Sequence, residues 1–148
     1  MRKIIEILIF MIGLNLSAQS IDYNTKKGYV ANGYDVVAYF DGQPLEGSKT
    51  FTQEHNGVRF KFSSSKNLEK FKADPKKYIP KYGGYCAYAM AKKGDKVSID
   101  PETYEIRDGR LFLFYNSWGT NTLKSWIAES PKKLRPLADS NWEKVKTK

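Results

Sequence analysis

Phe51-Thr-Gln-Glu-His-Asn-Gly-Val-Arg-Phe-Lys-Phe62 predicts a β-hairpin. Asn56-Gly57 is the strongest short-range hairpin signal, because a type I′ turn needs two residues that tolerate positive φ. In the second arm, apolar side chains alternate with Arg59 and Lys61, which predicts one buried and one solvated face. We therefore expect two antiparallel strands joined at Asn56-Gly57.

Helical signals follow this hairpin. Ser63-Ser-Ser65 offers hydroxyl groups that can cap a helix running through Phe71. Asp74-Pro75 then predicts a second helical turn that runs to Tyr78, with the aspartate as cap and the proline at the first helical position. A short buried helix is expected over 85–91, where small and aromatic residues alternate.

Further strands are expected before and after these helices. Asp35-Val-Val-Ala-Tyr-Phe40 is rich in β-branched and aromatic residues, which is typical of a strand. Asp108-Gly109 separates an arm at 103–107 from an arm at 110–115 and predicts a second hairpin.

The C-terminal part reads as helical. A helix is expected to begin at Asn121 or Thr122 and to end at Ser130-Pro131, and Asp139-Ser140 predicts the cap of a last helical turn. The order of hairpin, helices, second hairpin and C-terminal helices predicts an α+β fold.

The first residues predict export from the cytoplasm. Arg2 and Lys3 precede an apolar stretch over 4–16, and small residues follow at Ser17-Ala18. This stretch is too short to span a bilayer permanently, so it favours a cleaved signal peptide over 1–19, with an uncleaved anchor as the alternative. We expect a periplasmic or secreted protein with no stable membrane insertion after cleavage.

The rest of the chain predicts one domain. A polar leader over 20–29 would precede a domain over 30–142, and a charged tail over 143–148 is expected to fray. The formal net charge is +9, but the lysines are scattered, which favours a solvated surface. For an exported protein we expect no nucleic-acid partner, and the sequence leaves protein partners open.

Cys86 is the single cysteine of the chain, so no internal disulfide can form. It is therefore a buried structural thiol, a metal ligand, a reactive nucleophile or an intermolecular link. If its segment is helical, Cys86 and Met90 lie one turn apart. Together with His55, the only histidine, they would form a nitrogen–sulfur set suited to copper or zinc. The alternative is that Cys86 and Met90 are ordinary core residues.

Two other function classes remain open. A thiol enzyme would use Cys86 at the start of a helix, where its pKa is lowered, with His55 as base and Asp35 as the group that orients it. A metal-free binding module would instead line a small-molecule or peptide pocket with aromatic side chains, although such side chains also build small cores. The candidate aromatic residues are Tyr82, Tyr85, Tyr88, Tyr115, Trp118 and Trp126.

Several motifs together resemble the YHS domain family. They are Asp35-Val-Val-Ala-Tyr-Phe40, Phe60-Lys-Phe-Ser-Ser64, Leu68-Glu-Lys-Phe71 and Ala73-Asp-Pro-Lys-Lys-Tyr78, followed by Tyr82-Gly-Gly-Tyr-Cys-Ala-Tyr88, Asp100-Pro-Glu, Asp108-Gly-Arg-Leu-Phe-Leu and Ala138-Asp-Ser-Asn-Trp142. The resemblance implies a treble-clef-like hairpin and helices, extended here by a second hairpin and C-terminal helices.

The resemblance also implies an association with metals. The cysteines of the family's metal-binding finger would fall on Ala38, Ser63 and Asn67, and its methionine on Phe40. Alanine, serine and asparagine cannot build a thiolate cage. We therefore expect an exported, non-catalytic ligand-binding protein in which a soft metal, copper or zinc, is held by Cys86 with His55 and Met90.

Overall fold

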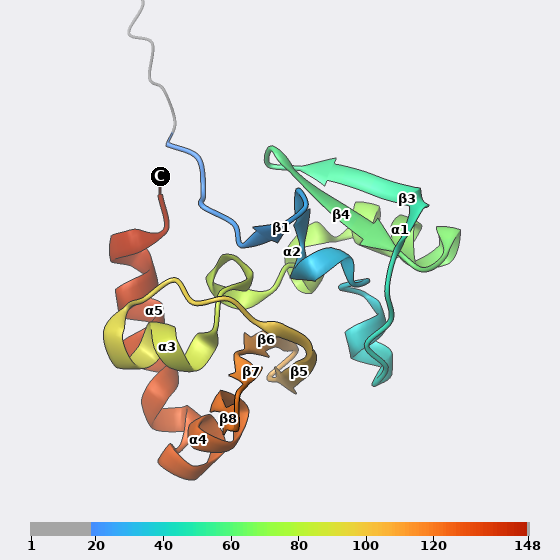
Figure 1. The fold of residues 1–148 in the computed structure, drawn as a ribbon. Helices are drawn as coiled ribbons and strands as arrows, with labels where there is room; N and C mark the ends of the chain where they lie inside the picture. Colours follow the sequence, from blue (N-terminus) through green and yellow to red (C-terminus); the bar gives the residue numbers. More distant parts are fainter. Residues whose placement is uncertain (1–18, 148) are drawn as a thin grey trace, which may run out of the picture.

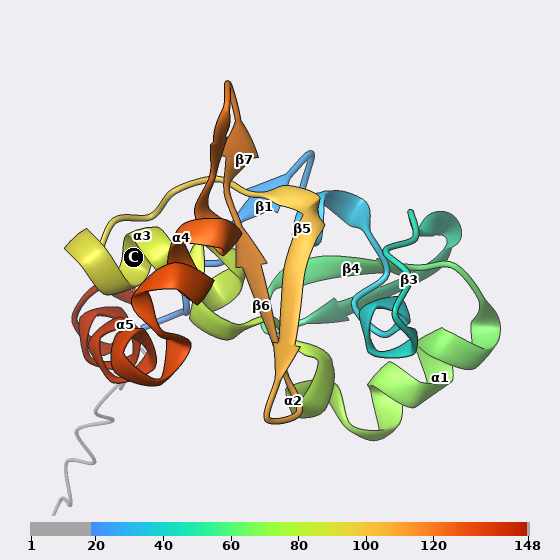
Figure 2. The same ribbon diagram turned by 90° about the horizontal axis from the view of Figure 1, so that it is seen from below.

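The computed structural model describes residues 19–147. A central hairpin of β5 (Asp100–Arg107) and β6 (Arg110–Phe114) stands between two groups of elements (Figure 1). A small sheet and two helices lie on one side, and three further helices lie on the other, as Figure 2 also shows. The mixture of small sheets and helices confirms the predicted α+β class.

The small sheet has four strands in the order β1-β2-β4-β3. Their bounds are Thr25–Lys26 for β1, Tyr29–Val30 for β2, Ser48–His55 for β3 and Val58–Phe62 for β4. The predicted hairpin is confirmed as β3 and β4, and Asn56 and Gly57 both have positive φ, at 51° and 80°. β2 runs parallel to β4 and brings the segment predicted as a polar leader into the sheet.

Helix α1 (Ser65–Ala73) follows β4, and helix α2 (Pro75–Tyr78) follows α1. Both were expected. The Ser64 hydroxyl accepts a hydrogen bond from the backbone N–H of Asn67 and caps α1 as the serine run predicts.

The central hairpin divides the core. Its turn, Asp108-Gly109, has positive φ at both residues, as predicted. Leu111 and Leu113 of β6 pack into the larger apolar cluster, while Phe112 and Phe114 pack into a second cluster with the C-terminal helices. Successive side chains of a strand point to opposite faces, so β6 is a wall shared by both clusters.

The C-terminal helices are α3 (Ala87–Lys93), α4 (Thr122–Glu129) and α5 (Pro131–Val145). α4 begins as predicted, because the Asn121 side chain accepts hydrogen bonds from two backbone N–H groups. A short hairpin that the sequence did not predict, β7 (Asn116–Ser117) with β8 (Thr120–Asn121), precedes it.

Helix α5 corrects the prediction of a single last turn at Asp139-Ser140. It spans 15 residues, with Pro136 inside it and Leu134 and Ala138 buried. Burial of an apolar face offsets the hydrogen bond that Pro136 cannot make. The tail expected to fray from residue 143 continues this helix, and the Lys146 carbonyl accepts a hydrogen bond from the Asp22 N–H at 2.7 Å.

The predicted signal peptide lies, apart from Gln19, outside the described residues. Within 19–147, none of the helices combines the length and apolar character needed to cross a bilayer.

The strand predicted over Asp35–Phe40 is wrong, since the chain there forms a turn followed by the short 3-10 helix η2 (Ala38–Asp41). The cause is the Asp35 side chain, whose Oδ1 accepts hydrogen bonds from the N–H groups of Val37 at 2.9 Å and Ala38 at 3.2 Å. These local bonds offer the backbone an alternative to a strand ladder.

The second oxygen of Asp35 reaches two other elements. Oδ2 accepts hydrogen bonds from the N–H of Ser63 at 2.8 Å, from the Ser63 hydroxyl at 2.7 Å and from Asn67 Nδ2 at 2.8 Å. Asp35 is completely buried. One carboxylate therefore joins the turn before η2, the end of β4 and the first turn of α1.

Replacing Asp35 by alanine should destabilise the protein by about 3–5 kcal/mol, because buried donors lose a charged acceptor. Urea unfolding followed by circular dichroism measures this difference. The exposed Asp41 of the same segment is the matched control, and Asp41→Ala should change stability by less than about 0.5 kcal/mol. Equal effects of the two substitutions would contradict the anchoring role of Asp35.

Candidate functional site

Cys86 lies directly before α3 and is completely buried. Its Sγ atom is 3.3 Å from the Thr122 hydroxyl at the start of α4. Its backbone N–H donates to the carbonyl of Val97 at 3.0 Å. These contacts give the thiol a packing role between two helix starts.

Met90 lies one helical turn after Cys86, since its N–H donates to the Cys86 carbonyl at 3.0 Å. The two side chains nevertheless belong to different apolar clusters, with Cys86 in the larger one and Met90 in the second. Among residues 19–147, no three His, Cys, Asp or Glu side chains are grouped so as to hold a metal ion.

His55 ends β3, and its ring packs edge-on against Phe71 with the ring centroids 5.8 Å apart. Asp35, expected to orient this histidine in a thiol enzyme, instead binds Ser63 and Asn67. Within the described part of the chain, no hydrogen bond joins His55 to Asp35 or to Cys86.

The positions that the YHS resemblance assigns to metal ligands surround the Asp35 carboxylate. The side chains of Ser63 and Asn67 and the backbone N–H of Ala38 all donate to it. Three donors to one carboxylate suit an anion rather than a cation, so these residues do not fit the finger's metal.

The candidate aromatic residues do not share one cavity. Tyr82 and Trp126 are buried in the second cluster, whereas Trp118, at the turn between β7 and β8, is 96% exposed. Tyr88 is bound through its hydroxyl to Glu129. These aromatic side chains therefore do not together line the pocket that a metal-free binding module was expected to have.

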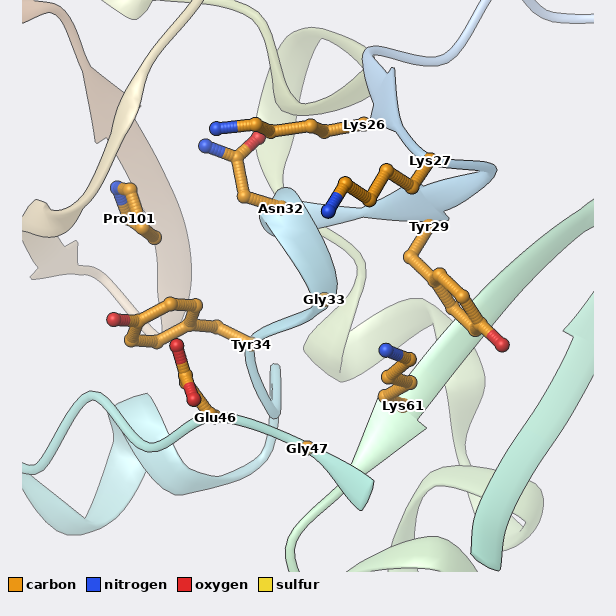
Figure 3. Close-up of a pocket in the computed structure, with 10 residues that line it drawn as sticks. All are labelled: Lys26, Lys27, Tyr29, Asn32, Gly33, Tyr34, Glu46, Gly47, Lys61 and Pro101. Atoms are coloured by element: carbon orange, nitrogen blue, oxygen red, sulfur yellow. The ribbon is translucent and has the colours of Figure 1, made fainter. Parts of the chain in front are cut away.

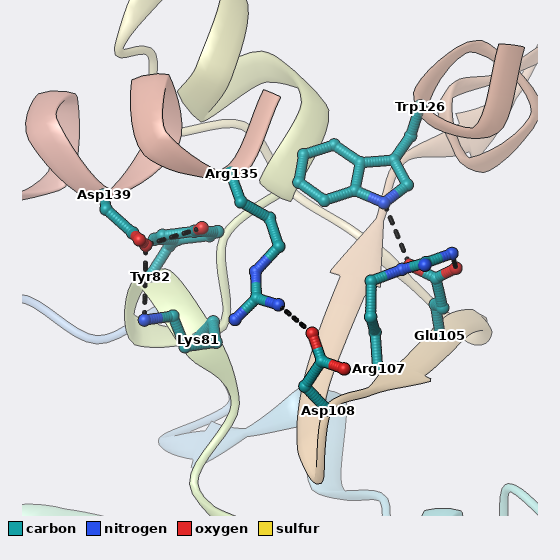
Figure 4. A network of polar contacts seen from close by, with 8 residues as sticks. All are labelled: Lys81, Tyr82, Glu105, Arg107, Asp108, Trp126, Arg135 and Asp139. Atoms are coloured by element: carbon teal, nitrogen blue, oxygen red, sulfur yellow. Dashed lines mark hydrogen bonds and ion pairs between the residues drawn. The ribbon is translucent and has the colours of Figure 1, made fainter. Parts of the chain in front are cut away.

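Charged side chains line more than one cavity of the described residues. One, of about 520 Å³, lies between the turn of the central hairpin and α5. It is lined by Arg107, Asp108, Lys132, Arg135, Pro136 and Asp139. Figure 4 shows that most of these charges are paired within the protein: Arg135 with Asp108, and Asp139 with Lys81.

The same network extends into the second cluster. Glu105 binds Arg107 and also accepts a hydrogen bond from Trp126 Nε1 at 2.9 Å. The Tyr82 hydroxyl donates to Asp139 at 2.9 Å, and burial, followed by the Asp139 charge, raises the pKa of Tyr82. These contacts join β5, α4 and α5, so few of the charged groups that line this cavity lack a partner.

The second charged cavity, of about 400 Å³, has a different character (Figure 3). It is lined by Lys26, Lys27, Tyr29, Asn32, Gly33, Tyr34, Glu46, Gly47, Lys61 and Pro101, and we call it the lysine pocket. The volume is within the range of small-molecule sites.

A left-handed turn forms the floor of the lysine pocket. Ala31, Asn32 and Gly33 have φ of 54°, 54° and 81°, a conformation that alanine rarely adopts. It is held by a hydrogen bond from Asn32 Nδ2 to the Ile99 carbonyl at 3.3 Å and by another from the Gly47 N–H to the Gly33 carbonyl at 2.9 Å. Strained backbone of this kind is concentrated at ligand sites.

The lysine side chains of the pocket have no ion-pair partners among the described residues. Lys61 Nζ lies 4.1 Å from the centroid of the Tyr29 ring, which positions it by a cation–π contact. In the described part of the chain, no carboxylate lies within 4.0 Å of an ammonium of Lys26, Lys27 or Lys61. This sets the lysine pocket apart from the cavity beside α5.

Gly47 packs closely against β4 at one wall of the lysine pocket. A side-chain carbon at Gly47 would lie within 3.0 Å of both the side chain and the backbone of Lys61, so only glycine allows this approach. The segment carrying Glu46 is therefore held directly against the strand that carries Lys61.

Sequence reasoning missed the lysine pocket. Lys26 and Lys27 were interpreted as one of several scattered lysine pairs on a solvated surface, and Lys61 as part of the solvated face of its hairpin arm. Only the parallel pairing of β2 with β4, at Tyr29 and Arg59, brings them together, and no local pattern predicts that pairing.

Comparisons with known proteins add no relative. No protein-family model matches the chain, and neither a curated protein nor a solved structure matches it significantly.

Because its sulfur is buried, Cys86 should resist alkylation at neutral pH in the folded protein. We expect iodoacetamide to modify it only at the rate of unfolding, and rapidly in urea, as measured by mass spectrometry. Rapid modification of the folded protein would contradict the packing role and favour a reactive thiol. Stoichiometric binding of copper(I) or zinc that Cys86→Ser abolishes would favour the metal prediction instead.

Proposed function

We propose that the protein is a non-catalytic binding module that holds a small anionic molecule in the lysine pocket. The observation that carries this proposal is the set of three ammonium groups around one cavity without ion-pair partners among the described residues. A cavity lined by charges of one sign raises the local concentration of ions of the opposite sign.

The charge balance of the lining supports an anion. Lys26, Lys27 and Lys61 contribute three positive charges against the one negative charge of Glu46, which leaves a net charge of +2. A carboxylate or phosphate group between the lysines would accept charge-assisted hydrogen bonds, which are stronger than those between neutral groups.

Export and family membership are part of the same proposal. Residues 1–19 favour delivery to the periplasm or the medium, where a binding module would meet small solutes. The hairpin of β3 and β4 followed by α1 is compatible with the treble-clef-like arrangement of a YHS domain. Copper or zinc binding by Cys86, His55 and Met90 stays a prediction, and the contact of Cys86 with Thr122 favours packing.

Isothermal titration of the protein with ethyl phosphate and with propionate tests the proposal. One of these probes should bind with a stoichiometry of one. Lys27→Gln and Lys61→Gln should each weaken its binding by about threefold to tenfold, because each removes one charge from the pocket.

Lys132→Gln is the matched control, since it removes the same charge from the cavity beside α5 and should leave binding unchanged. The absence of saturable binding by both probes would overturn the proposal. If Lys132→Gln weakened binding equally, the proposal would also be overturned, because the weakening would then come from the net charge of the protein and not from the lysine pocket.

A further inference from the structure

We infer that the ligand of the lysine pocket is a zwitterion, with its anionic group at the lysines and a positively charged amine at Tyr34 and Glu46. This inference rests on the proposed function and names the class of molecule that the same cavity selects.

The lysine pocket has two ends of opposite charge. Figure 3 shows Lys27 and Lys61 extending into one side and Tyr34 and Glu46 forming the other, while Lys26 extends alongside Asn32 and away from Lys61. A ligand with anionic groups alone would satisfy the first end and place negative charge towards the second. A ligand that also carries an amine satisfies both ends.

Glu46, like the lysines, has no ion-pair partner among the described residues. No lysine or arginine nitrogen of the described residues lies within 4.0 Å of its carboxylate. Coulomb attraction favours the pairing of opposite charges that line one cavity. Here they stay apart, which leaves a dipolar cavity for a dipolar ligand.

The backbone and the ring of Tyr29 maintain this separation. Lys61 is held over the Tyr29 ring, and Glu46 is held by the bridge between its backbone and that of Tyr34. The hydrogen bond from the Gly47 N–H to the Gly33 carbonyl fixes the next residue of the same segment. Lys61 and Glu46 therefore each extend from an anchored part of the backbone.

The Tyr34 end is negative beyond Glu46 itself. Partial burial raises the pKa of the Tyr34 hydroxyl, and the charges of Glu102, Glu46 and Asp100 raise it further, in that order. Of these three carboxylates only Glu46 lines the cavity, and Glu102 and Asp100 act on Tyr34 from outside the lining. The Tyr34 ring adds a face on which a cation can bind.

Two matched pairs of probes separate the amine from the anion. O-phosphoethanolamine has the ammonium that ethyl phosphate lacks, and β-alanine has the ammonium that propionate lacks. In at least one pair, the zwitterion should bind about fivefold more tightly than the anion, as measured by isothermal titration.

Glu46→Gln removes the negative charge of the second end while keeping the size of the side chain. It should abolish the preference for the zwitterion and leave the binding of the simple anion equal to, or slightly tighter than, that of the wild-type protein. Glu54→Gln, on the exposed part of β3 outside the lining, is the control and should keep the preference.

The outcomes separate this inference from the function on which it rests. If the simple anion binds and Lys27→Gln weakens it, but the zwitterion binds no better, the zwitterion inference is wrong and anion binding stands. A preference that survives Glu46→Gln also overturns the inference. If neither simple anion binds saturably, the proposed function fails and this inference, which rests on it, fails with it.

Discussion

The carboxylate of Asp35 is the interaction on which the arrangement of the sheet half depends. It accepts hydrogen bonds from its own turn and from two sites about thirty residues later, the end of β4 and the first turn of α1, and it is completely buried. Its neighbours in sequence connect it to the lysine pocket. Tyr34 directly precedes it, and Lys61 lies two residues before its partner Ser63. The same bonds that fix the turn before η2 therefore fix two sides of the pocket.

This carboxylate also bears on the YHS resemblance. Ala38, Ser63 and Asn67 occupy the positions that the resemblance assigns to metal-binding cysteines, and all three donate hydrogen bonds to Asp35. A metal bound by thiolates and a carboxylate bound by N–H and O–H groups have opposite charge requirements. The two arrangements can nevertheless join the same three segments, because each places one multivalent centre among them.

The parts of the fold that could be predicted are those specified by local chemistry. Asn56-Gly57 and Asp108-Gly109 predicted both large hairpins, since their turns need residues that tolerate positive φ. The strand over Asp35–Phe40 was wrong because a side-chain cap outweighed β-propensity. The length of helix α5 was underestimated because Pro136 interrupts its helical pattern. The burial that stabilises the helix comes from residues that are distant in the sequence. The lysine pocket was missed for the same reason, since four segments form it and none is distinctive alone.

Strand β6 has a consequence for how the molecule unfolds. Its side chains enter the two apolar clusters alternately, so neither cluster can open without exposing one face of this strand. The two halves on either side of the central hairpin therefore share their stability and should melt as one cooperative unit. A sharp single transition would follow from one five-residue strand, although the chain builds two separate cores around it.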